Sequence, residues 1–190
     1  MTPAAAAMLR LLDRATVRWH FPVVGRAKGR LLRRLLARHR PRRAVEVGSL
    51  FGYSAILIAG SLPRGGRLVA LESNPFMGWM IEVNVREAGL GRRVSVRVGD
   101  ARRVIPTLRG RFDFALIDAA KTEYLDYLRR LEPKLRPGAV VVADNTGIFR
   151  RDVASYLRHV RESGRYQTRE YRFGDDAMEV SILGPGRPGR

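Results

Sequence analysis

Short apolar segments alternate with amphipathic ones along the chain from about residue 44 onward. The apolar segments are rich in valine, isoleucine, leucine and alanine, as is typical of strands in a sheet covered on both faces. They predict strands at residues 44–47, 67–71, 94–98, 112–117, 139–143, 166–173 and 178–183. We expect the last two strands to pair antiparallel at one sheet edge, joined by a turn at 174–176.

Helical periodicity fills the intervals between these strands. It predicts helices at residues 52–60, 75–88, 101–108, 122–135 and 151–162, and two more at 4–19 and 27–39 before the first strand. The helix at 27–39 carries leucines on one face and arginines on the other, and Pro41 ends it. A turn at Arg136-Pro137-Gly138 is expected to lead into the fifth strand.

The alternation of strands and helices predicts an α/β fold with a doubly wound, Rossmann-like sheet of seven strands. We expect the sheet to be mostly parallel, with an antiparallel hairpin at its C-terminal edge and helices on both faces. Residues 1–184 are interpreted as a single domain, made of N-terminal helices (1–40) and a Rossmann-like core (44–184). Residues 185–190 are rich in glycine and proline and are expected to form a flexible tail.

Composition narrows the classes of protein to consider. Of the 190 residues, 45% are hydrophobic, which favours a globular fold, and none is cysteine, which excludes disulfides and thiolate chemistry. No apolar run approaches the roughly 20 residues that span a bilayer. The N-terminus lacks the basic start of a secretory signal. We therefore expect a cytoplasmic location and no membrane partner.

The net charge of +18 is the most unusual bulk property of the chain. Between Arg26 and Arg43 there is no acidic residue, and basic residues are crowded together. Such an excess attracts polyanions, so RNA is one candidate partner. The alternative is a compositional bias toward arginine that is spread over solvated faces.

The segment from residue 44 to 54 predicts a small-molecule site. An apolar strand runs into Gly48 and Gly52 and then into Ser54, which can open a helix. This arrangement brings backbone N–H groups close to a ligand. The glycine spacing matches neither the dinucleotide fingerprint nor a P-loop. Glu72 ends the second strand, where a ribose hydroxyl would need an acceptor, and Gly99–Ala101 close the third, so a nucleoside-containing cofactor is favoured over an ordinary strand–helix turn.

Polar residues also follow the fourth and fifth predicted strands. Asp118 ends one strand, and Asp144 and Asn145 end the next. Neighbouring strand ends lie side by side, so these oxygens can converge on one point, and such hard ligands suit Mg²⁺. The absence of cysteine and of paired histidines argues against zinc. Capping of the following helices is the alternative role for each aspartate.

These strand ends together resemble the class I S-adenosylmethionine-dependent methyltransferases. More narrowly, the chain resembles the catechol O-methyltransferase-like, cation-dependent O-methyltransferases, from about Val24 to Leu183. The segment Val24-Gly25-Arg26-Ala27-Lys28-Gly29 is similar to a family segment that lies over cofactor and substrate. The resemblance implies that S-adenosylmethionine is bound by Val24, Glu46, Gly48, Ser49, Gly52, Tyr53, Ser54, Glu72, Ser73, Gly99, Asp100, Ala101 and Asp118.

The same resemblance implies the reacting groups. Asp118, Asp144 and Asn145 match the ligands of Mg²⁺ or another divalent cation, and Lys121 matches the catalytic lysine. The family often has a second acidic residue where Ala120 stands here. Glu170 is a candidate for orienting a second substrate hydroxyl. The candidate substrate-binding residues are thus Lys121, Asn145 and Glu170, and the candidates for an aromatic gate are Trp19, His20 and Phe149.

The implied reaction is methyl transfer from S-adenosylmethionine to a hydroxyl of a small, catechol-like or phenolic acceptor. The first alternative is a tRNA (hydroxyuridine) O-methyltransferase of the same family, favoured by the net charge. The second is a non-catalytic RNA-binding module. The Asn/Asp-Pro-Pro-aromatic motif of amino-directed nucleic-acid methyltransferases is absent after the fourth strand, which disfavours base N-methylation. The resemblance also suggests a homodimer.

Overall fold

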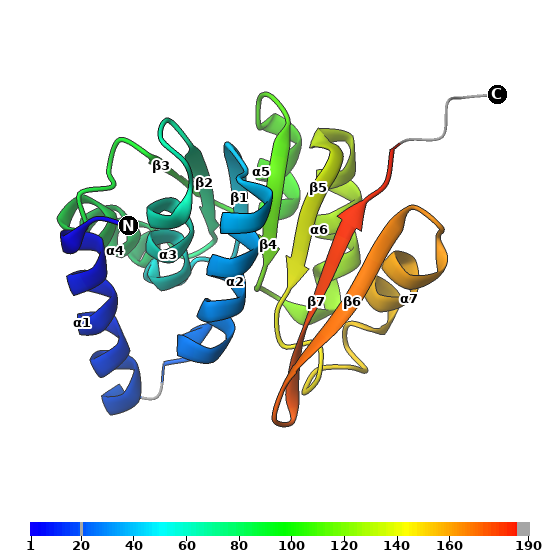
Figure 1. Ribbon diagram of the computed structural model, residues 1–190, viewed down its shortest axis with the longest axis horizontal. Coiled ribbons are helices and arrows are strands. Elements are labelled where there is room, and N and C mark those ends of the chain that lie inside the picture. The colour runs from blue at the N-terminus through cyan, green and yellow to red at the C-terminus, as the bar shows by residue number, and fades with distance from the viewer. Residues whose placement is uncertain (20, 186–190) are drawn as a thin grey trace.

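The computed structural model describes residues 1–19 and 21–185, and the predicted tail lies outside them beyond Pro185 (Figure 1). Seven strands form one sheet in the order β3-β2-β1-β4-β5-β7-β6. Strands β1 to β5 are parallel, and β7 runs antiparallel to both β5 and β6. Their bounds are β1 Arg43–Val47, β2 Arg67–Glu72, β3 Val94–Val98, β4 Phe112–Ile117, β5 Leu135–Ala143, β6 Tyr166–Phe173 and β7 Asp176–Leu183. The predicted fold class and antiparallel edge hairpin are confirmed.

Helices cover both faces of the sheet (Figure 1). Helices α1 to α4 pack against one hydrophobic cluster and α5 to α7 against the other. Their bounds are α1 Pro3–Trp19, α2 Gly25–His39, α3 Tyr53–Ser61, α4 Pro75–Glu87, α5 Ala101–Thr107, α6 Tyr124–Leu131 and α7 Ala154–Glu162, with 3₁₀ turns η1 Lys121–Glu123 and η2 Glu132–Lys134. Among the described residues, no helix is both long and apolar enough to cross a membrane.

The central strands supply both clusters because successive side chains point to opposite faces. In β5, Val140 and Val142 pack on one side, while Val141 and Ala143 pack on the other. All four are fully buried. This two-sided burial explains why the central strands read as continuous apolar runs rather than as alternating patterns.

Four sequence predictions need correction. The strand predicted at 178–183 begins at Asp176, which shortens the turn predicted at 174–176, and the helix predicted at 151–162 begins at Ala154.

The predicted helix at 122–135 is divided into η1, α6 and η2. The α-helical part ends at Leu131, since Pro133 lacks the N–H that a continuing α-helix needs. The predicted turn at Arg136-Pro137-Gly138 is wrong, because these residues lie inside β5. They form an irregularity there, since the pairing with β4 shifts between Phe112 and Phe114. Gly138, with φ of 80°, accommodates the local bend.

The topology collects the functional residues at one edge. The carboxyl ends of β4 and β5 lie at the lower edge in Figure 1, where the turn between β6 and β7 also lies. Backbone hydrogen bonds continue the pairing just past the strand ends. Asp118 N donates to Val47 O of β1 at 2.9 Å, and Asp144 N donates to Ile117 O of β4 at 3.0 Å. Ligands of doubly wound sheets bind at this edge.

Candidate active site

A cleft of about 820 Å³ opens at the carboxyl edge of the sheet. Most of the predicted cofactor residues line it, namely Val24, Gly48, Ser49, Tyr53, Ser54, Glu72, Ser73, Gly99, Asp100, Ala101 and Asp118. Glu46 and Gly52 lie outside the lining. The predicted reacting residues Lys121, Asp144 and Asn145 line the same cleft. The structure therefore brings the two predicted sites together in one space.

Gly48 sits where β1 leaves the sheet against the end of β4. Its φ is 85°, and a Cβ at this position would collide with the backbone carbonyl of Asp118. Its N–H donates to Leu71 O at 3.0 Å, which ties the turn to β2. Glycine is required here because the backbone approaches two neighbouring strands closely.

Glu46 is fully buried beneath this turn. Its Oε2 accepts a hydrogen bond from Ser49 Oγ at 2.5 Å, whereas its Oε1 has no partner among the described residues. Burial raises the pKa of Glu46 to about 7, against the lowering effect of the Ser49 hydrogen bond. A buried oxygen without a donor favours a ligand that brings an N–H or O–H group.

Glu72 is fixed by the backbone around it. Its Oε2 accepts from Leu50 N at 2.9 Å, and its Oε1 accepts from Asn74 N at 3.0 Å. Leu50 has a φ of 49°, in the left-handed region that a leucine rarely adopts. The carboxylate is thus held at the cleft at the end of β2, where it can still accept from ligand hydroxyls.

Asp100 has a structural partner in addition to its place in the cleft. It caps α5 by accepting from Arg102 N at 2.9 Å, and it pairs with the Arg102 guanidinium at 2.8 Å. These hydrogen bonds lower the pKa of Asp100 to about 2. The carboxylate is therefore ionised at neutral pH.

The predicted reacting residues meet around one ammonium group. Lys121 Nζ lies 2.7 Å from Asp118 Oδ1, 2.8 Å from Asn145 Oδ1 and 2.8 Å from the Tyr124 hydroxyl. Lys121 comes from η1, directly after β4, so a short turn returns its side chain to the strand ends. The aspartate and amide oxygens thus converge on a single cationic atom.

Two residues of this cluster were not singled out from the sequence. Lys28 of α2 places its Nζ 2.5 Å from Asp144 Oδ1 and 2.6 Å from Asp176 Oδ2. Asp176, the first residue of β7, also accepts from Asn145 Nδ2 at 2.8 Å. Lys28 lies in the segment 24–29, which is similar to a segment of the family. No local pattern marks Asp176, because only the folding of the β6–β7 hairpin brings it to the site.

The charges around Asp144 compete with one another. Asp144 is 1% exposed, and burial, with repulsion from Asp118, raises its pKa to about 6 although Lys28 opposes the rise. Burial also disfavours charge on Asp176, yet hydrogen bonds from Lys28 and Asn145 lower its pKa to about 2. Lys28 therefore bridges two acids that belong to different parts of the chain.

The donor set fits a hard divalent cation. Asp118 Oδ1 and Asn145 Oδ1 both bind the positively charged Nζ of Lys121, and Asp144 lines the same cleft. Within residues 1–19 and 21–185, no group of three His, Cys, Asp or Glu residues is arranged to hold a metal. A cation here would therefore use the Asn145 amide as its third protein ligand, with all ligands being oxygen.

The structure does not bring Glu170 to the cleft. Its strand, β6, is at the sheet edge, and its carboxylate pairs with Arg150, Arg161 and Arg172. These hydrogen bonds lower its pKa to about 2 even though burial opposes them. Glu170 is opposite Glu179 in the β6–β7 register, and Arg161 of α7 binds both side chains.

Of the candidates for an aromatic gate, one lines the cleft and one does not. Phe149 lines the cleft, and Lys121 Nζ lies 5.6 Å from the centre of its ring. Trp19 is 64% exposed and does not line the cleft. His20 lies outside the described residues.

Comparisons with known proteins find O-methyltransferases. A family model described as "O-methyltransferase" matches residues 3–183. A catechol O-methyltransferase from Niastella koreensis is 37% identical over 122 residues, covering 62% of this chain and 55% of that protein. One from Sus scrofa is 34% identical over 179 residues, covering 87% and 95%. The chain thus spans about half the length of the first relative and nearly all of the second.

A solved structure extends the likeness to the fold. It is the O-methyltransferase TomG from Streptomyces achromogenes, involved in tomaymycin synthesis, in complex with SAM. Its TM-score to this chain is 0.81 at 25% identity, covering 97% of this chain and 91% of that one.

Proposed function

We propose that this chain, which belongs to the O-methyltransferase family, transfers a methyl group from S-adenosylmethionine to a hydroxyl of a small catechol-like acceptor. The observation that carries the proposal is the convergence of Asp118, Lys121 and Asn145 in the cleft that also contains the glycine turn and Glu72. The names of the relatives support a catechol-type acceptor. In this proposal residues 1–184 form a single methyltransferase domain.

Residues in the cleft and beneath its glycine turn supply a group for each part of the cofactor in this assignment. Glu72 accepts from ribose hydroxyls, and the free Oε1 of Glu46, which is buried beneath the turn, accepts from the amino group of the methionine part. Asp100 and Ala101 border the adenine in this assignment. When bound, S-adenosylmethionine supplies an electrophilic methyl group on a sulfonium, and a divalent cation supplies charge that stabilises an acceptor oxyanion.

The residues of this chain position the acceptor and handle its proton. Asp118, Asp144 and Asn145 hold the cation in this proposal, and Phe149 provides an apolar wall beside them. In this proposal Lys121, in its neutral amine form, takes up the hydroxyl proton at Nζ and becomes the ammonium that lies beside Asp118 and Asn145. Much of the rate gain comes from holding the two reactants at attack distance in one cleft.

A transfer assay tests this function. Labelled S-adenosylmethionine is incubated with a panel of catechols and simple phenols, with Mg²⁺ and then with EDTA. We expect methyl ethers of catechols and loss of the product in EDTA. Lys121→Ala is expected to lower kcat by at least about 100-fold with little change in cofactor affinity. Lys134→Ala is the matched control, because Lys134 lies outside the cleft lining and its Nζ bonds, among the residues that the structure describes, to Leu108 O alone.

Three results would decide against parts of this assignment. Activity that survives EDTA would contradict the proposed dependence on a divalent cation. A loss of cofactor affinity in Lys121→Ala assigns that lysine to binding rather than to proton transfer. Absence of methyl transfer to every catechol and phenol, with S-adenosylmethionine bound, removes the small-acceptor proposal.

The net charge of +18 favours a second acceptor class, a hydroxyuridine in tRNA. Helix α2 begins beside the cleft, which Val24 lines, and carries exposed arginines along its length. Methyl transfer to total tRNA, but to no phenol, would select this class. We also propose a homodimer formed through the N-terminal helices, which light scattering after size-exclusion chromatography tests.

A further inference from the structure

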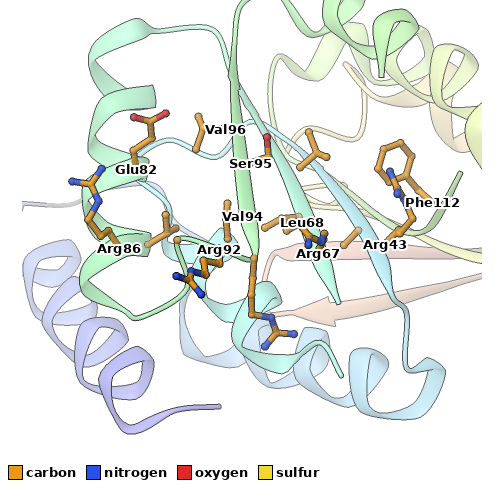
Figure 2. A pocket seen from close by; sticks show the side chains of 15 residues that line it. Arg43, Arg67, Leu68, Glu82, Arg86, Arg92, Val94, Ser95, Val96 and Phe112 are labelled. Atoms are coloured by element: carbon orange, nitrogen blue, oxygen red, sulfur yellow. The ribbon is translucent and has the colours of Figure 1, made fainter. Parts of the chain in front are cut away.

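A second hollow lies at the opposite edge of the sheet from the cleft, where β1, β2 and β3 begin (Figure 2). Its volume is about 700 Å³. Glu82 and Arg86 project from α4 at one end, and Arg43 and Phe112 lie at the other. Its lining includes one carboxylate, Glu82, and the arginines at positions 43, 67, 86, 92 and 93, and we call it the arginine groove.

Strand register forces several of these arginines together. Arg43 begins β1 and is opposite Arg67, which begins β2. Arg93 precedes Val94, whose partner in β2 is Leu68, so Arg93 lies at the level of Arg67. Neighbouring strands are about 4.8 Å apart, and like charges on adjacent positions repel. An anion in the groove would relieve this repulsion.

Two of the arginines are already engaged by the protein. Arg93 donates to the carbonyls of Leu62, Pro63 and Gly66 at 2.7–3.1 Å. Arg43 donates to Arg109 O at 2.8 Å, and its guanidinium lies 5.6 Å from the centre of the Phe112 ring. These bonds fix the back of the groove.

The other three guanidiniums are available to a ligand. Arg67, Arg86 and Arg92 are exposed, and none makes an ion pair or a side-chain hydrogen bond with any other residue that the structure describes. The buried Nε of Arg43 also lacks a partner among those residues. Cationic side chains thus outnumber carboxylates in this space, since five arginines and a single carboxylate, Glu82, line it.

We propose that the arginine groove binds a phosphorylated ligand, whose phosphate oxygens contact Arg67, Arg86 and Arg92. A guanidinium presents a planar fork of donors that matches phosphate, and a multiply charged anion can neutralise several of them together. Val69 and Val96, both half-buried, line the groove beside the arginines and offer an apolar surface to the rest of the ligand. A free nucleotide and a strand of RNA both supply this chemistry.

The groove and the candidate active site lie at opposite ends of the same strands. A ligand in the groove therefore leaves the cleft open, and the proposed phosphate site stands whether or not methyl transfer is confirmed. Part of the excess of basic residues therefore lies near the starts of three strands, and not only on the exposed face of α2.

Calorimetric titration with three probes tests the site: inorganic pyrophosphate, uridine diphosphate and a short single-stranded RNA. S-adenosylhomocysteine is present throughout, because under the proposed function it fills the cofactor part of the cleft. We expect the double variant Arg67→Glu/Arg92→Glu to bind at least about tenfold more weakly than the unmodified chain to every probe that the unmodified chain binds. The control, Arg151→Glu/Arg158→Glu, makes the same change in net charge at exposed positions outside the groove and is expected to stay within about twofold.

The pattern of binding identifies the source of the phosphate. Groove-dependent binding of uridine diphosphate supports a nucleotide, and groove-dependent binding of RNA alone supports a nucleic-acid strand. Equal weakening in both double variants would show general attraction to a basic protein and overturn the site, as would no binding of any probe. Arg92→Gln, with circular dichroism of every variant, provides a milder change at an exposed side chain that separates lost binding from lost folding.

Discussion

At the scale of single residues, the orientation of one amide organises the candidate active site. Asn145 directs its Nδ2 to Asp176 and its Oδ1 to Lys121, each at 2.8 Å. An amide held at both ends presents a defined oxygen toward the cleft. Asp176 therefore acts on the predicted cation site through Asn145 rather than by facing it.

Asp176→Ala is expected to weaken binding of a divalent cation by about tenfold, because partners that orient a ligand typically contribute that much. Binding of Mn²⁺ to the cofactor-loaded protein, followed by electron paramagnetic resonance, measures this without turnover. Asp175→Ala, at the exposed neighbouring position of the same turn, is the control. Unchanged Mn²⁺ affinity in Asp176→Ala would show that Asp176 does not position Asn145 for cation binding.

The raised pKa of Glu46 predicts how the stability of the fold depends on pH. Its pKa is raised from 4.5 to about 7 by burial, so the folded chain binds a proton that the unfolded chain releases in this window. Its contribution to stability is fully present below pH 4.5 and is lost as pH rises toward 7. The loss amounts to about 3 kcal/mol.

The isosteric variant Glu46→Gln removes this titration. We expect its free energy of unfolding to fall less than that of the unmodified chain between pH 4.5 and pH 8, as measured by urea denaturation at each pH. Glu82→Gln, at an exposed carboxylate, is expected to leave the pH dependence unchanged. Parallel pH profiles for all three proteins would show that Glu46 titrates normally in the folded chain.

At the scale of elements, the sequence predicts best where burial alone decides the structure. Strands β3, β4 and β6 have the predicted bounds, because their apolar or alternating runs end at clear turns. The start of β5 was missed because Pro137 and Gly138 usually signal a turn, and only pairing with β4 keeps them in the sheet. Lys28 and Asp176 were missed as site residues for the same reason, since contacts between distant elements place them.

The hairpin of β6 and β7 depends on close contact with the loop after β5. A Cβ at Gly147 would lie 2.7 Å from backbone atoms of residues 175, 176 and 177. Thr146 N also donates to Ala177 O at 2.9 Å across this contact. Little space therefore separates the loop from the start of β7, where Asp176 begins the strand.

Gly147→Ala is accordingly expected to lower the free energy of unfolding by about 1–3 kcal/mol, since backbone atoms must shift to admit the methyl group. Gly91→Ala is the matched control, because its new Cβ would meet neighbours at ordinary contact distance, 3.7 Å or more. Urea denaturation of both variants measures the difference. Equal stability of the two would mean that the hairpin moves away without cost.

At the scale of the whole molecule, two opposite edges of one sheet carry different chemistry. The carboxyl edge gathers acids around two lysines, and the amino edge gathers arginines that face a single carboxylate. The chain as a whole has 36 basic side chains against 18 acidic ones. Repulsion among the unpaired cations therefore opposes folding, and the effect should depend on salt.

Raising NaCl from 10 mM to 150 mM shortens the screening length from about 30 Å to about 8 Å, so the unfolding temperature is expected to rise. Differential scanning fluorimetry measures the shift. Arg151→Glu/Arg158→Glu, which lowers the net charge at exposed positions that line neither the cleft nor the arginine groove, should show a smaller rise than the unmodified chain. A fall in unfolding temperature with salt would mean instead that attractive ion pairs, such as those of Arg161 with Glu170 and Glu179, outweigh the repulsion.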